Sequence, residues 1–108
     1  MSSTLEALAR VLEERKQACV ETSYVAGLYA RGVDEILKKL GEEATELLLA
    51  AKGDDDHAVV HEVADLWFHS LVLLAHRELG PEAVLRELEN RMGRSGLEEK
   101  AARFSASD

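Results

Sequence analysis

Carboxylate side chains with helical spacing are the feature of this sequence that most directly indicates chemistry. Glu42, Glu43 and Glu46 lie in the segment GEEATE, and Glu62 and Asp65 stand three residues apart in the segment HEVAD. Residues three or four apart share one face of an α-helix. Two facing helices that each carry such carboxylates would form a site lined by oxygen atoms, which are the ligands that Mg²⁺ prefers.

The two acidic segments lie in different surroundings. Taken alone, GEEATE is typical of a solvated helix face, because glutamate is a good helix former. The second segment belongs to a stretch, residues 61–76, that is apolar nearly all the way round. Ionised carboxylates in such a stretch are destabilising unless they are paired or bind a metal. An ion pair with lysine or arginine, or a narrow solvated groove, is the alternative, and His69 and His76 are interpreted as histidines at the edge of the core.

Helical periodicity places one lysine beside the first group of carboxylates. At about 100° per residue, Lys39, Glu43 and Glu46 form one stripe at the edge of the apolar arc, and Glu42 points further outward. Gly41 is unusual here, because a glycine inside a helix costs about 1 kcal/mol relative to alanine. We expect another backbone or a ligand to approach it closely.

Four helices are expected to position these side chains. They are predicted at residues 4–22, 34–52, 54–79 and 81–92, with a short segment at 23–31. Asp34 is expected to cap the second helix. The sequence predicts an all-α, antiparallel four-helix bundle as one domain over residues 1–108, with a polar tail at 93–108 of the kind that is often mobile. The third helix, apolar on almost every side, is expected at the centre of the bundle or in an oligomer interface.

Composition excludes several classes of protein. The net charge of −8 argues against nonspecific binding to nucleic acid. The single cysteine, Cys19, excludes an intrachain disulfide, and there is no cysteine–histidine cluster with zinc spacing. The longest apolar run, residues 71–75, is too short to span a bilayer, and the N-terminus lacks the pattern of a signal peptide. We therefore expect a cytoplasmic protein that binds neither nucleic acid nor a membrane.

The acidic pattern resembles that of the all-α nucleoside triphosphate pyrophosphohydrolases. The pattern is EExxE at residues 42–46, then fifteen residues, then ExxD at 62–65. Within this superfamily, the segments DEILKKLGEEATELLLAAK, EVADLWFHSLVLLA and SGLEEKAAR resemble the phosphoribosyl-ATP pyrophosphatases of histidine biosynthesis. The resemblance covers roughly residues 5–103, which is nearly the whole chain.

The resemblance implies an activity, a cofactor and an assembly. The activity is hydrolysis of a small nucleotide, phosphoribosyl-ATP, to phosphoribosyl-AMP and pyrophosphate. Mg²⁺ is the implied cofactor, with Glu43, Glu46, Glu62 and Asp65 as its ligands. The implied assembly is a homodimer or an oligomer built from dimers.

The chemistry of phosphoanhydride hydrolysis suggests roles for further residues. The reaction needs charge neutralisation and a positioned water more than covalent catalysis. Glu42 or Glu46 is the candidate general base. The basic residues that are candidates for binding the substrate are Arg31, Lys38, Lys39 and Arg94. A solvated role is equally consistent with each of these except Lys39, which shares the carboxylate stripe.

Two other functions stay open. The first is hydrolysis of a different nucleoside triphosphate by an enzyme of the same superfamily. The second is a helical interaction module without enzymatic activity, in which the acidic stripe is only a polar face. Saturable Mg²⁺ binding distinguishes the enzymes from the module.

Overall fold

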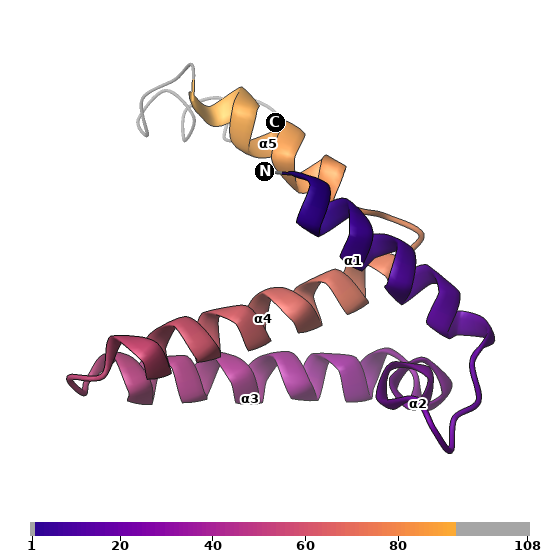
Figure 1. The fold of residues 1–108 in the computed structure, drawn as a ribbon, viewed down its shortest axis with the longest axis horizontal. Helices are drawn as coiled ribbons and strands as arrows, with labels where there is room; N and C mark the ends of the chain where they lie inside the picture. Colours follow the sequence, from indigo (N-terminus) through magenta and orange to yellow (C-terminus); the bar gives the residue numbers. More distant parts are fainter. Residues whose placement is uncertain (1, 93–108) are drawn as a thin grey trace, which may run out of the picture.

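The computed structural model describes residues 2–92, and within this range the chain is all-α, as predicted. Five helices take the place of the expected four, because the short segment after residue 22 is a helix of its own (Figure 1). The helices are α1 (Ser2–Glu14), α2 (Tyr24–Arg31), α3 (Val33–Ala51), α4 (Asp56–His76) and α5 (Pro81–Met92), with a 3-10 turn, η1 (Arg15–Gln17). The predicted tail at 93–108, with Arg94, lies outside the described residues.

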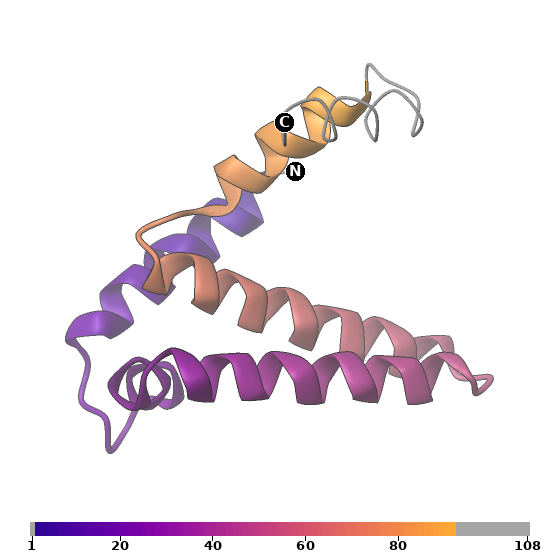
Figure 2. The ribbon, with the colours of Figure 1, turned by 180° about the vertical axis from the view of Figure 1, so that it is seen from behind.

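A long antiparallel pair, α3 and α4, dominates the fold. The two helices run side by side and are joined by a tight turn at residues 52–55 (Figures 1 and 2). α2 packs at the start of α3, α1 crosses the C-terminal end of α4, and α5 packs against α1. No second long pair of helices covers α3 and α4 within residues 2–92.

The core is small and lies where α1, α2, the start of α3 and the end of α4 meet. Its buried hydrophobic residues are Leu12, Val25, Ala26, Leu28, Ile36, Leu71, Val72 and Ala75. Thirteen large hydrophobic residues of the described range are exposed, against these eight buried ones. The described residues thus leave more large hydrophobic side chains exposed than buried.

The first helix ends at Glu14, not at residue 22 as predicted. After the 3-10 turn, Ala18 adopts an extended conformation with ψ of 162° and turns the chain away from the helix axis. Ser23 then caps α2, because its hydroxyl oxygen accepts a hydrogen bond from the backbone N–H of Ala26 at 3.1 Å. The hydroxyl of Tyr29 donates to the carbonyl of Leu12 at 2.9 Å and fastens α2 to α1. Tertiary contacts thus override the local helical pattern.

Gly32, and not Asp34, is the residue that caps α3. Its φ of +95° is accessible to glycine at little cost, which lets α2 and α3 follow each other without a longer loop. Asp34 lies in the first turn of α3, where a negative charge interacts favourably with the helix dipole. At the other end of the helix pair, Asp55 caps α4 by accepting a hydrogen bond from the backbone N–H of His57 at 3.0 Å.

Averaged over its length, α4 is long and apolar enough to cross a membrane. The uninterrupted apolar runs of the sequence do not reveal this, because the charged and polar residues of α4 divide it into short runs. The core helix of a folded domain meets the same criteria, and α4 packs along α3 and against α1. It also carries Glu62 and Asp65 on the side that faces α3.

Candidate active site

The four predicted metal ligands lie together between α3 and α4. Glu43 and Glu46 of α3 and Glu62 of α4 each place a carboxylate oxygen within 4.8 Å of the others. Asp65, one turn further along α4, has an oxygen within the same distance of Glu62. These four carboxylates are called the carboxylate cluster below. Each of the two helices carries a pair of carboxylates three residues apart on one face, and these two faces meet.

Glu43 is the buried member of the carboxylate cluster, with 7% of its surface exposed. Burial, followed by the negative charges of Glu46 and Asp65, raises the pKa of its carboxyl group to about 7. In its protonated form Glu43 can donate a hydrogen bond to a neighbouring carboxylate. The metal-free protein therefore relieves part of the repulsion in the cluster by holding a proton there.

Glu62 carries an unsatisfied polar atom. Its Oε1 is buried and has no hydrogen-bond partner among residues 2–92, and leaving such an atom unpaired costs about 1–3 kcal/mol. No ion pair within the described range joins a lysine or arginine to any member of the carboxylate cluster. The alternative of a buried ion pair therefore finds no support in the described residues. An all-carboxylate donor set with one unpartnered oxygen fits a hard divalent cation.

His61 is a neighbour of the carboxylate cluster that the sequence analysis missed. Its Nε2 lies 3.3 Å from an oxygen of Asp65, four residues later on α4. The i, i+4 spacing of these two residues was the signal that could have identified the contact. The side chain of His61 is exposed, so it sits at the solvent side of the cluster.

A second missed feature links α2 to the cluster. His69, interpreted from sequence as a residue at the edge of the core, is buried. Its Nδ1 lies 2.9 Å from the backbone carbonyl oxygen of Asp65, and its Nε2 lies 2.8 Å from the hydroxyl of Tyr24. A carbonyl oxygen can only accept, so Nδ1 donates, and Nε2 of the neutral ring accepts from Tyr24. Because Tyr24 and His69 are 45 residues apart, no local pattern could have paired them.

The candidate substrate-binding residues lie in different places. Lys39 is 3.3 Å from Glu42 on the same helix. Glu42 is exposed and is not a member of the carboxylate cluster. Arg31 lines a cavity of about 270 Å³ together with Tyr24 and residues 20–23 and 27. Lys38 is exposed and makes no ion pair within the described range.

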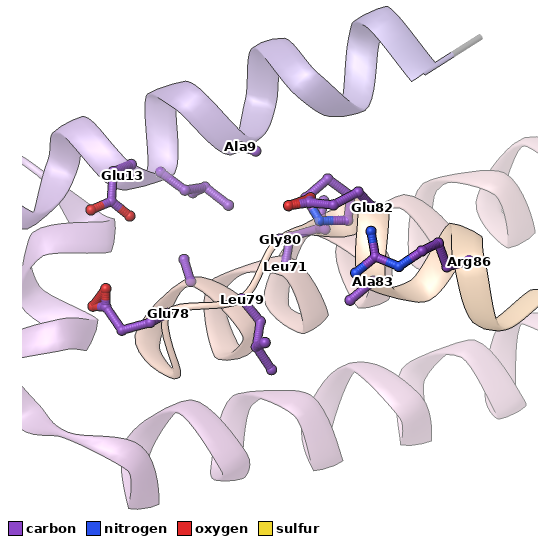
Figure 3. A pocket seen from close by; sticks show the side chains of 12 residues that line it. Ala9, Glu13, Leu71, Glu78, Leu79, Gly80, Glu82, Ala83 and Arg86 are labelled. Atoms are coloured by element: carbon purple, nitrogen blue, oxygen red, sulfur yellow. The ribbon is translucent and has the colours of Figure 1, made fainter.

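Another cavity, of about 420 Å³, lies between α1, the end of α4 and the start of α5 (Figure 3). Glu13 and Glu78 line one side of it, and Glu82 and Arg86 line the other. Lys16 bridges the first two acids, at 3.1 Å from Glu13 and 3.0 Å from Glu78. Lys16 in η1 thus links the end of α1 to the segment that follows α4. None of the predicted site residues that fall within residues 2–92 lines this cavity.

Comparison with known proteins agrees with the resemblance deduced from the sequence. The family model described as phosphoribosyl-ATP pyrophosphohydrolase matches residues 5–92, a range that includes the whole carboxylate cluster. A protein from Methylococcus capsulatus named phosphoribosyl-ATP pyrophosphatase is 59% identical over 99 residues, which cover 92% of this chain and 94% of the relative. A family match over most of the chain and a relative this similar lead to one conclusion: the chain belongs to the phosphoribosyl-ATP pyrophosphohydrolase family.

Proposed function

We propose that this protein hydrolyses phosphoribosyl-ATP to phosphoribosyl-AMP and pyrophosphate, in the cytoplasm, as the second step of histidine biosynthesis. The observation that carries the proposal is that carboxylates of α3 and α4 lie within 4.8 Å of Glu62, whose Oε1 is buried and has no partner among the described residues. The name of the relative supports the choice of substrate. Because the products are a monophosphate and pyrophosphate, the bond that breaks joins the α and β phosphates, and the oxygen of water ends on one of them.

Glu43, Glu46, Glu62 and Asp65 are the residues that would hold Mg²⁺. When bound, Mg²⁺ supplies positive charge that offsets the negative charge of the phosphates in the transition state. Glu43, Glu46 and Glu62 lie close enough together to share one ion, and Asp65 lies beside Glu62. Glu43 has to lose its proton to become a ligand, so the high pKa of this carboxyl group makes the metal and the proton competitors for the same oxygen atoms.

We assign the role of general base to Glu46 in preference to Glu42. Glu46 is a member of the carboxylate cluster that is exposed to solvent, so a water beside the cluster can reach its carboxylate. Glu42, the other candidate, is paired with Lys39 and holds that cation beside the site. Lys39 and Arg31 are then available for the phosphates of the substrate.

Pyrophosphate release tests the choice of substrate. The protein is incubated with Mg²⁺ and either phosphoribosyl-ATP or one of a panel of ordinary nucleoside triphosphates. We expect phosphoribosyl-ATP to give the highest kcat/KM, by at least about tenfold, because binding energy from the additional phosphoribosyl group is used in the transition state. A higher kcat/KM for a nucleoside triphosphate would show that the enzyme acts on a different substrate, as other members of the superfamily do. No turnover of any nucleotide, together with no Mg²⁺ binding, would favour the interaction module.

We also propose that the protein is a homodimer or an oligomer of dimers, formed through α3 and α4. Leu48, Leu49, Val60 and Trp67 of these two helices are each between 59% and 69% exposed. Burying such side chains contributes about 1.5–3 kcal/mol each. Gly41 lies on the same stripe of α3 as Leu48, and a Cβ atom added there meets nothing within 4 Å. The close approach that a glycine permits would therefore come from a partner helix.

Light scattering at micromolar concentration tests the dimer. We expect a mass of about 24 kDa, which is twice the 11.9 kDa of the chain. Leu48→Glu should shift the mass to that of a monomer, because it places a charge in an apolar interface. Val20→Glu is the matched control, since Val20 is also exposed but lies in the loop before α2. A wild-type monomer, or a dimer that tolerates Leu48→Glu, would contradict this interface.

A further inference from the structure

Within residues 2–92, two groups of side chains bring metal-ligating atoms together, and one of these groups contains a nitrogen. His61, Glu62 and Asp65 of α4 each offer one atom, and the three atoms lie within 4.8 Å of one another. The other group is made by Glu43, Glu46 and Glu62, which offer only oxygen atoms. Glu62 belongs to both groups, so the two groups lie side by side and share one carboxylate. The nitrogen of His61 has no role in the proposed binding of Mg²⁺.

The spacing of His61 and Asp65 along α4 is typical of a pair of metal ligands on one helix. In the helical motif HExxH, two histidines four residues apart bind Zn²⁺ from the same face. The segment HEVAD, residues 61–65, has this spacing with an aspartate at the place of the second histidine. Because aspartate oxygens are also ligands for Zn²⁺, the segment offers a donor atom at both positions.

The distance between these two side chains fits an ion placed between them. Nitrogen and oxygen ligands lie about 2.1 Å from Zn²⁺, so two of them at a tetrahedral angle are about 3.4 Å apart. In this structure Nε2 of His61 lies 3.3 Å from Oδ2 of Asp65. The side chains of His61 and Asp65 are 66% and 38% exposed, so an ion can reach them from solvent. Glu62 completes the group, and its buried Oε1 has no hydrogen-bond partner among the described residues.

We propose that His61, Glu62 and Asp65 bind a transition-metal ion, for which Zn²⁺ is the best match, with water as the fourth ligand. Imidazole nitrogen is a good ligand for Zn²⁺, whereas Mg²⁺ is bound through oxygen. The proposal rests on the proposed function in one respect, which is that Glu62 and Asp65 are also the ligands of Mg²⁺. An ion held by His61 takes these two carboxylates from the Mg²⁺ position, so Zn²⁺ and Mg²⁺ compete.

Calorimetry with Zn²⁺ tests this site, with His61→Asn as the variant and His57→Asn as the matched control. His57 is also exposed on α4 and lies one turn before His61, outside both groups of ligand atoms. We expect His61→Asn to bind Zn²⁺ at least about tenfold more weakly than the wild type, because even the loss of a residue that only supports a ligand has an effect of this size. The affinity for Mg²⁺ should change far less. His57→Asn should leave Zn²⁺ binding unchanged.

The visible absorption of Co²⁺ gives a second readout that does not depend on turnover. The absorption bands of this ion report its geometry and its ligands, and Co²⁺ binds to the same kinds of ligand as Zn²⁺. The wild type should give the intense bands of a tetrahedral site, which Zn²⁺ removes by displacing Co²⁺. His61→Asn should give only the weak bands of Co²⁺ surrounded by oxygen. In addition, Mg²⁺ titrated into protein loaded with Zn²⁺ should bind several-fold more weakly than Mg²⁺ titrated into metal-free protein.

Several results would overturn the proposal. One is Zn²⁺ binding that His61→Asn leaves unchanged or that His57→Asn weakens equally, since equal weakening indicates a surface pair of histidines. Another is a Co²⁺ spectrum that is the same in the wild type and in His61→Asn. An affinity for Mg²⁺ that bound Zn²⁺ does not alter would contradict the competition. Wild-type protein that turns over no phosphoribosyl-ATP is a separate result, since it contradicts the proposed function while Zn²⁺ calorimetry still tests His61.

Discussion

Glu62→Gln and Asp65→Asn are expected to lower kcat for phosphoribosyl-ATP by about two to three orders of magnitude. Both substitutions keep the shape of the side chain and remove its charge. Glu62 and Asp65 come from the same face of α4 and supply the half of the carboxylate cluster that faces α3. Loss of either one takes away a ligand for Mg²⁺ and weakens the compensation of charge on the phosphates.

The same two variants should be as stable as the wild type, or more stable, when no metal is present. The carboxylate cluster brings four acidic groups together, and their repulsion already favours a proton on Glu43. An amide at position 62 or 65 removes part of this repulsion. Added Mg²⁺ should stabilise the variants less than the wild type, because a ligand stabilises a protein only as far as it binds the native state.

Thermal melts with and without Mg²⁺, measured beside turnover, separate the metal site from a structural ion pair. If Glu62 were the partner of a buried cation, Glu62→Gln would cost about 3–5 kcal/mol of stability. The control is Glu87→Gln, since Glu87 forms an exposed ion pair with Arg91 on α5 and should affect neither property. A large loss of metal-free stability with activity retained would end the interpretation of the cluster as a metal site.

Glu43 should make the metal-free protein lose stability as the pH rises. The pKa of its carboxyl group is about 7 in the folded protein and 4.5 for the ordinary group, so the folded state binds this proton more tightly than the unfolded state. The stabilisation from this proton is fully present below about pH 4.5 and is lost as the pH rises through about 7. Above pH 7 the buried carboxylate is ionised beside Glu46 and Asp65, with no proton to relieve the repulsion.

Urea unfolding in EDTA between pH 4.5 and pH 8 measures this effect. Other groups also titrate in this range, so the quantity of interest is the difference between the wild type and Glu43→Gln. The free energy of unfolding of the wild type should fall with pH relative to that of the variant, and most of the change should lie between pH 5 and pH 8. Parallel pH profiles for the two proteins would show that Glu43 does not hold a proton in the folded state. Saturating Mg²⁺ should reduce the difference, because the ion takes the place of the proton.

Local sequence patterns predict which carboxylates share a face within each helix. Glu43 with Glu46, and Glu62 with Asp65, are each three residues apart, so helical geometry alone places each pair on one face. The polar members of an otherwise apolar helix then indicated that the two faces meet. The break after Glu14 was not predicted, because the segment that follows has a helical pattern and is redirected by contacts between α1 and α2.

Contacts between residues that are far apart in the sequence could not be predicted from local patterns. The hydrogen bond between Tyr24 and His69 joins residues 45 apart, and nothing in the neighbourhood of either one indicates it. The sequence predicts that His69 lies at the edge of the core, whereas this residue is buried and accepts a hydrogen bond from Tyr24. The raised pKa of Glu43 likewise depends on how deeply α3 and α4 bury this residue between them. Helical periodicity places Glu43 at the edge of the apolar arc but does not give the extent of its burial.

The rate of pyrophosphate release from phosphoribosyl-ATP, measured while Mg²⁺ is titrated into metal-free protein, tests the central claim most directly. The carboxylate cluster as a Mg²⁺ site predicts no release without the ion, a saturable rise as it is added, and a return to background with EDTA. Release that is equally fast in EDTA, or no release at saturating Mg²⁺, would contradict the account.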